Sequence, residues 1–311
     1  MKSWKRETAM VRPPPTQAPS RWSGNERPAR VRRILFWILW ANLLLVGVKV
    51  GVGWWIGSLA VMGDAAHSGV DALNNLIALG AIYLAAAPPD EEHPYGHGKF
   101  ETLGAFMISG FLSITCFELL RSAATRLIEN APPPNPSLPA LAVLAGTMVV
   151  NIGVAYYERR KGNELESELL SADARHTQAD VWVTLSVLIG LGLVRLGWGA
   201  ADAVLAVLVA GLVAHSGYQI LRHTVPVLVD RRAVDAGRIV DVASRVEGVD
   251  SVSEIRSRGR PGEAFAELTV LVHPATQVRQ AHVIADEVER RVATELELTN
   301  VVVHVEPSEL H

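Results

Sequence analysis

Six long apolar stretches constrain the fold of this chain more than any other feature of its sequence. A helix needs about 20 mostly apolar residues to cross a hydrocarbon core of about 30 Å. Stretches of this kind start near Ile34, Ser58, Thr102, Leu138, Ala172 and Ala200. The apolar core of the first is too long for a secretory signal peptide, and no clear small-residue cleavage site follows it. The sequence therefore predicts a domain of six transmembrane helices over residues 34–222.

The segments on either side of this domain are polar. Residues 1–33 are basic and rich in proline, a composition that cannot bury an apolar core and predicts a disordered tail. Residues 226–311 show a helix, two alternating strands, a second helix and a last strand, the order of a small ferredoxin-like α+β domain. From Asp230 onward the chain has 15 acidic and 10 basic residues, which argues against nucleic acid as a partner.

The distribution of Lys and Arg predicts how the helices are oriented, because positive side chains collect on the cytoplasmic side of a membrane protein. The first 33 residues hold nine of them, and the loops "ERRKGNE" and "RHTVPVLVDRR" are also basic. The intervening loops "WIGS", "ENAPPPNPS" and "GWGA" contain none. We therefore expect an integral protein of the plasma membrane, in contact with lipid, with both termini in the cytoplasm.

Two of the predicted transmembrane helices carry the same polar pattern. His67 and Asp71 in the second stretch, and His176 and Asp180 in the fifth, are four residues apart and so share one face of a helix. Ionisable side chains inside a membrane are costly and usually functional. Two imidazoles and two carboxylates suit a tetrahedral divalent cation, zinc first, because Cys116 is a lone thiol and His is a poor ligand for Mg2+ or Ca2+.

Other polar side chains in the apolar stretches have simpler interpretations. Asp64 and Asp173 each precede one of the two histidines by three residues, and we expect them to support the ligands or a helix end rather than to bind the ion. Lys49, Asn42 and Asn151 are expected to settle helix packing or to face a cavity. A membrane-embedded zinc enzyme is disfavoured, because the sequence has no HExxH and four ligands leave no position for a catalytic water.

Three longer motifs occur in the order "GSLAVMGDAAHSGVD", "DEEHPYGHGKFE" and "ADARHTQADVW". With the six-helix and α+β layout, they resemble the cation diffusion facilitators over nearly the whole chain after the tail. The resemblance implies a homodimeric secondary transporter, not an enzyme, that moves Zn2+ out of the cytoplasm in exchange for protons. By motif position, His67, Asp71, His176 and Asp180 resemble the transport site of that family. Export of Fe2+, Co2+, Mn2+ or Cd2+ stays open, as does a metal-binding membrane scaffold with little flux.

The loop between the second and third stretches holds a second set of donors. Asp90, His93 and His97 match the metal site that the family has in this loop, so the resemblance implies a second ion there. Lys99 resembles a lysine that pairs, near the cytoplasmic dimer interface, with an aspartate after the last helix, which is Asp230 in this chain. A lysine that only contributes to the positive cytoplasmic side is the competing interpretation.

The C-terminal segment matches the family pattern less completely. His282, His304 and Glu306 occupy positions where the family often binds metal across the dimer. Ser253 and Thr269 stand where many members carry histidine. We therefore expect at most one regulatory zinc site in this domain, formed by His282, His304 and Glu306, rather than a two-metal cluster.

Overall fold

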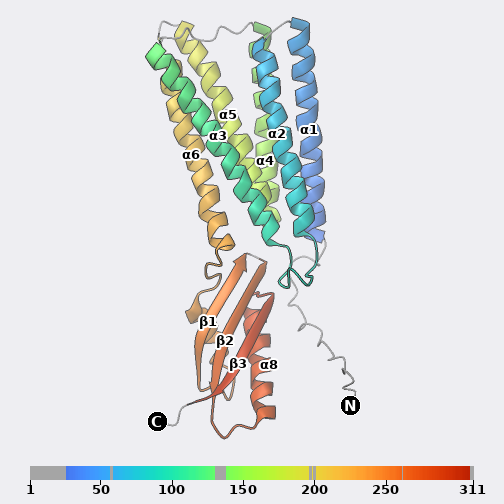
Figure 1. The fold of residues 1–311 in the computed structure, drawn as a ribbon, viewed down its shortest axis with the longest axis vertical. Helices are drawn as coiled ribbons and strands as arrows, with labels where there is room; N and C mark the ends of the chain where they lie inside the picture. Colours follow the sequence, from blue (N-terminus) through green and yellow to red (C-terminus); the bar gives the residue numbers. More distant parts are fainter. Residues whose placement is uncertain are drawn as a thin grey trace, which may run out of the picture. The chain divides into compact units, whose positions relative to one another are not determined.

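The computed structural model describes residues 26–56, 59–129, 138–195, 198, 201–260 and 262–308. The chain divides into a helical unit over residues 24–229 and a C-terminal unit that begins at Asp230. The helical unit contains six long helices, which run alongside one another (Figure 1): α1 (Glu26–Ile56), α2 (Leu59–Ala85), α3 (Lys99–Glu129), α4 (Leu138–Glu164), α5 (Glu168–Arg195) and α6 (Ala201–Leu228). Within it, α1 packs chiefly against α2, α3 against α6, and α4 against α5.

The helical unit has the surface of a membrane domain. Five of its helices contain described stretches that are long and apolar enough to cross a membrane: Glu26–Trp55, Ser68–Ala85, Lys99–Thr125, Leu138–Glu164 and Val204–Leu228. The remaining helix, α5, has a similar length, and its N-terminal half carries the second HxxxD pattern. Large apolar side chains such as Trp37, Leu44 and Val149 are exposed, as expected for a surface that faces lipid. The predicted fold, six membrane helices followed by a small α+β domain, is confirmed.

The first helix begins earlier than the sequence predicted. α1 starts at Glu26, so the disordered tail predicted for residues 1–33 is wrong for residues 26–33. These eight residues add about two turns to the helix, and hydrogen bonds from Arg27 tie them to the rest of the unit. Residues 1–25, the remainder of the predicted tail, lie outside the described part of the chain.

A buried ion pair joins three segments at this end of the helical unit. Arg27 of α1 donates to both carboxylate oxygens of Glu101 of α3, at 2.8 and 3.2 Å. Its guanidinium also donates to the carbonyl oxygens of Leu165 and Glu166, at 2.7 Å each, and Ser167 Oγ donates to Glu101 at 2.5 Å. Glu101 is completely buried. The network, which we call the Arg27 clamp, therefore connects α1, α3 and the α4–α5 turn, and so links the three packed pairs of helices.

The C-terminal unit follows the predicted order of elements: α7 (Ala236–Ala243), β1 (Ser251–Arg260), β2 (Glu263–Val272), α8 (Val278–Glu295) and β3 (Asn300–Pro307). The sheet has the order β1-β2-β3, with β1 antiparallel and β3 parallel to the central β2. The parallel pairing requires a crossover between β2 and β3, which α8 supplies.

The core of the C-terminal unit follows from the alternation in β2. Ala264, Ala266, Leu268 and Val270 are buried at every second position, and they join the apolar face of α8, including Val288. Side chains on one face of a strand recur every two residues, so this face is the one that packs in the core. The opposite face of the sheet carries His304 and Glu306 of β3, both exposed.

Candidate metal centre

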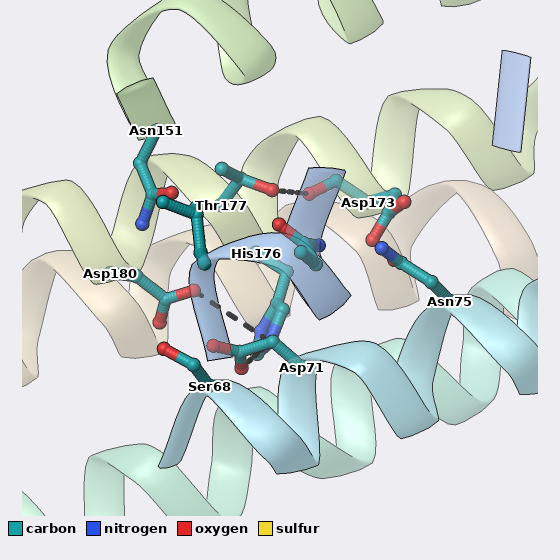
Figure 2. Close-up of a pocket in the computed structure, with 10 residues that line it drawn as sticks. Ser68, Asp71, Asn75, Asn151, Asp173, His176, Thr177 and Asp180 are labelled. Carbon is teal, nitrogen blue, oxygen red and sulfur yellow. Dashed lines mark hydrogen bonds and ion pairs between the residues drawn. The ribbon is translucent and has the colours of Figure 1, made fainter. Parts of the chain in front are cut away.

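Three of the four predicted transport ligands meet inside the helical unit. Asp71 of α2 and His176 and Asp180 of α5 offer ligand atoms that all lie within 4.8 Å of one another. His176 Nε2 is 3.3 Å from Asp71 Oδ1 and 3.8 Å from Asp180 Oδ2. Figure 2 shows the imidazole of His176 pointing toward both carboxylates. Since His176 is 4% exposed and Asp180 7% exposed, the group is sheltered from solvent within the chain.

Helix geometry explains how the sequence brings these groups together. His176 and Asp180 are one turn apart on α5, so both project from the face that α5 turns toward Asp71 of α2. His67 lies one turn before Asp71 on the same helix, although its side chain is outside the part of the chain that the structure describes. Asp64, also on α2, lies outside it in the same way.

Polar side chains from four helices line a pocket around this group. The lining residues are Asn42, Leu45, Ser68, Asp71, Asn75, Asn151, Asp173, His176, Thr177 and Asp180. With its amide nitrogen facing Asp173, Asn75 donates to both oxygens of that carboxylate, at 3.1 and 3.3 Å, and accepts from Asn42 at 2.7 Å. Asp173 therefore borders the three-ligand group, held by Asn75, and is not one of its members (Figure 2).

Two buried ionisable residues lie near the pocket: Lys49, which was expected to settle helix packing or to face a cavity, and Glu158, for which the sequence predicted no role. Glu158 of α4 is completely buried and accepts a hydrogen bond from Thr177, the residue after His176, at 3.2 Å. Lys49 of α1 donates to Ser68 of α2 at 2.7 Å. Glu158 could have been noticed as a carboxylate at the end of the fourth apolar stretch. The segment "ERRKGNE", which begins with it, was interpreted only as a basic loop.

The second predicted group of donors also comes together. Asp90, His93 and His97 lie in the loop between α2 and α3 with their ligand atoms within 4.8 Å. The His93 and His97 nitrogens are 3.3 and 3.4 Å from the Asp90 carboxylate. The backbone N–H of His93 donates to Asp90 at 2.6 Å, and this bond lowers the pKa of the Asp90 carboxyl below its usual value. The loop thus presents an ionised carboxylate between two imidazoles.

The donors predicted in the C-terminal unit do not come together within one chain. His282 lies 3.7 Å from Asp286 on α8, and His304 lies 3.2 Å from Glu306 on β3. Among the described residues, these donors do not complete a group of three like the two described above. Thr269, opposite His304 in the sheet, is buried.

The predicted partners Lys99 and Asp230 belong to different units of the chain. Lys99 is the first residue of α3 in the helical unit. Asp230 opens the C-terminal unit, where its carboxylate is 3.8 Å from Arg258. The pairing of Lys99 with Asp230 stays a prediction.

The chain has a membrane domain of six helices, a buried group of His and Asp side chains, and an appended α+β unit. These features define an integral membrane protein with a candidate cation site. Residues 35–229 match the model of the cation efflux transmembrane domain, and residues 232–308 match that of the cation efflux protein cytoplasmic domain. The chain therefore belongs to the cation efflux family of transporters, and the resemblance noted in the sequence is confirmed.

Individual relatives are similar over most of the chain. The cation-efflux pump FieF of Salmonella arizonae is 28% identical over 267 residues, 85% of this chain and 89% of the relative. FieF of Salmonella typhimurium is 29% identical over 269 residues, 86% of this chain and 89% of the relative. Among solved structures, a form of the MamM CTD is 32% identical with a TM-score of 0.23, covering 24% of this chain and 91% of its own.

Proposed function

We propose that the protein exports Zn2+ from the cytoplasm in exchange for protons, through a site made of His67, Asp71, His176 and Asp180. The observation that carries this proposal is the convergence of Asp71, His176 and Asp180 from two helices to within 4.8 Å. His67 is one turn from Asp71 on α2 and supplies the fourth ligand. Two imidazole nitrogens and two carboxylate oxygens match the tetrahedral preference of zinc.

Proton exchange follows from the chemistry of the same ligands. An imidazole nitrogen or a carboxylate must lose its proton before it can bind a metal ion. His176 Nε2 faces the carboxylates of Asp71 and Asp180, so a proton on that nitrogen is held by the same oxygens that would bind the metal. Zinc and protons therefore compete for one position. A helix rearrangement that exposes this position to either side in turn couples zinc export to proton entry.

The other parts of the chain take supporting roles in this proposal. Asp90, His93 and His97 bind a second ion in the loop between α2 and α3. The C-terminal unit joins two copies into a homodimer, and a regulatory ion bound by His282, His304 and Glu306 requires donors from both copies. We place the protein in the plasma membrane with both termini in the cytoplasm, since the basic loops lie at that end.

Transport by purified protein in lipid vesicles tests the proposal. Zinc entry under an imposed pH gradient is compared for the wild type, Asp71→Asn and Asp180→Asn, changes that keep side-chain size and remove a charged ligand. We expect gradient-dependent entry in the wild type and its loss in both variants. Asp90→Asn, in the loop, serves as the matched control and should retain entry. Tight zinc binding without flux in the wild type would instead support a metal-binding scaffold.

A further inference from the structure

Asn74 contacts the proposed transport site at its central nitrogen. The side chain of Asn74 on α2 is 1% exposed, and its Nδ2 lies 3.0 Å from His176 Nε2 on α5. That nitrogen is the one that also faces Asp71 Oδ1 and Asp180 Oδ2. Asn74 is three residues after Asp71, so the two side chains leave α2 on the same side. An amide thus stands beside the atom that would bind the ion.

The amide of Asn74 has an unused acceptor. Its Oδ1 is buried and has no hydrogen-bond partner among the described residues. Buried polar atoms are nearly always satisfied, and an exception calls for an explanation such as a bound ion or water. Asn75, the next residue, is equally buried and uses both of its amide atoms, one on Asp173 and one on Asn42. Of these two neighbouring asparagines, the one that contacts His176 is therefore the one with an unused oxygen.

An asparagine can present either of two atoms to the same place. Its nitrogen donates to an imidazole nitrogen that carries no proton, and its oxygen accepts from a protonated one or binds a cation. A half-turn of the amide group about the Cβ–Cγ bond exchanges the positions of its nitrogen and its oxygen. Because Asn74 already reaches His176 Nε2, the same half-turn brings Oδ1 to the edge of the metal position.

We propose that Asn74 is a further metal ligand that sets which ions the site accepts, an inference that rests on the proposed transport function. When His176 Nε2 carries neither the ion nor a proton, the amide nitrogen of Asn74 donates to it. With metal, its carbonyl oxygen adds to the four ligands and enlarges the coordination shell.

This extra oxygen bears on ion choice because divalent ions differ in the ligands they favour. Zn2+ is satisfied by four ligands in a tetrahedron. Mn2+ favours carboxylate and carbonyl oxygens in a larger, octahedral shell. A neutral carbonyl oxygen therefore contributes little to the binding of zinc and much to the binding of manganese. The site with Asn74 accepts both ions, and the site without its oxygen discriminates against manganese.

The test measures equilibrium binding of Zn2+ and Mn2+ to the purified full-length protein, with the binding of Asp180→Asn subtracted to isolate the intramembrane site. For Asn74→Leu we expect manganese binding to weaken about 10-fold or more, the usual cost of losing a residue that supports a metal site, with zinc binding nearly unchanged. Asn74→Asp restores an oxygen and should restore manganese binding. Thr147→Val, which changes a buried polar side chain of α4 that does not line the pocket, should leave the ratio of the two affinities unchanged.

Cobalt absorption gives an independent readout, since four-coordinate Co2+ absorbs visible light more strongly than Co2+ with more ligands. Asn74→Leu should increase the absorption of bound Co2+ relative to the wild type. The role of Asn74 would be overturned if Asn74→Leu left the ratio of the zinc and manganese affinities unchanged, or if the wild type bound zinc but not manganese. Zinc binding that is the same in wild type and Asp180→Asn would overturn the proposed transport site itself, a different result.

Discussion

The Arg27 clamp leads to a quantitative prediction about the stability of the helical unit. Glu101→Gln keeps the shape of the side chain and removes its charge. Three hydrogen bonds reach this carboxylate, two from Arg27 and one from Ser167. A glutamine amide has one acceptor oxygen in place of two, so it cannot keep all three bonds, and the guanidinium of Arg27 loses its opposite charge. A lost hydrogen bond to a charged group costs about 1.5–3 kcal/mol, so the substitution should cost about 3 kcal/mol. Removing one partner of a buried ion pair typically costs about 3–5 kcal/mol of stability. The cost here should be near the lower end of that range, because Arg27 is partly exposed.

The assay is reversible unfolding in mixed micelles of a mild detergent and dodecyl sulfate, followed by helix content. A double-mutant cycle with Arg27→Met isolates the pair, because Glu101→Gln should cost much less once Arg27 is absent. Glu164→Gln, which breaks the exposed pair with Lys161, is the matched control and should change stability little. A cost below about 1 kcal/mol for Glu101→Gln, or an equal cost with and without Arg27, would show that the ion pair does not stabilise the helical unit.

Three further predictions concern the loop and the C-terminal unit. Asp90→Asn should lower the number of zinc ions bound per chain by one at neutral pH, because it removes the carboxylate between His93 and His97. Isothermal titration would contradict this if the stoichiometry stayed the same as in the wild type. Leu268→Ala should destabilise the C-terminal unit by about 2–5 kcal/mol, because it leaves a cavity, whereas the exposed Val302→Ala should change little in urea unfolding; equal effects would count against the described core. Arg290 and, less strongly, Arg291 lower the pKa of Glu287 from 4.5 to about 2. The contribution of the Glu287 carboxylate to stability is therefore present above pH 4.5 and is lost as the pH falls through about 2. The stability difference between wild type and Glu287→Gln should shrink over that interval, and a difference independent of pH would contradict this role of the two arginines.

Much of the fold could be predicted because hydropathy and strand alternation are local signals. The apolar windows located the membrane helices, and the alternation in "AFAELTVLV" located β2 and the face that forms its core. The start of α1 could not be predicted in this way. Arg27 looked like one of many basic residues in a tail, and its partners Glu101 and the α4–α5 turn lie far from it in the sequence.

The metal centre could also be predicted only in part from local sequence patterns. His176 and Asp180 share a helix face by spacing alone, so their proximity could be predicted, and the repeat of the spacing in α2 indicated the partner Asp71. Asn74 and Glu158 were missed because their importance depends on contacts between helices. The position of Asn74, one turn after Asp71, was a signal that could have suggested it.

If zinc and protons exchange at one site, a zinc gradient alone must drive proton movement, and this movement can be measured. Vesicles containing the full-length protein and a trapped pH indicator start with equal pH on both sides and receive zinc outside. We expect the vesicle interior to become more alkaline as zinc enters, at a rate that follows zinc entry, and Asp180→Asn to abolish both signals together. Zinc entry with no change of internal pH, in vesicles with a clamped membrane potential, would contradict it.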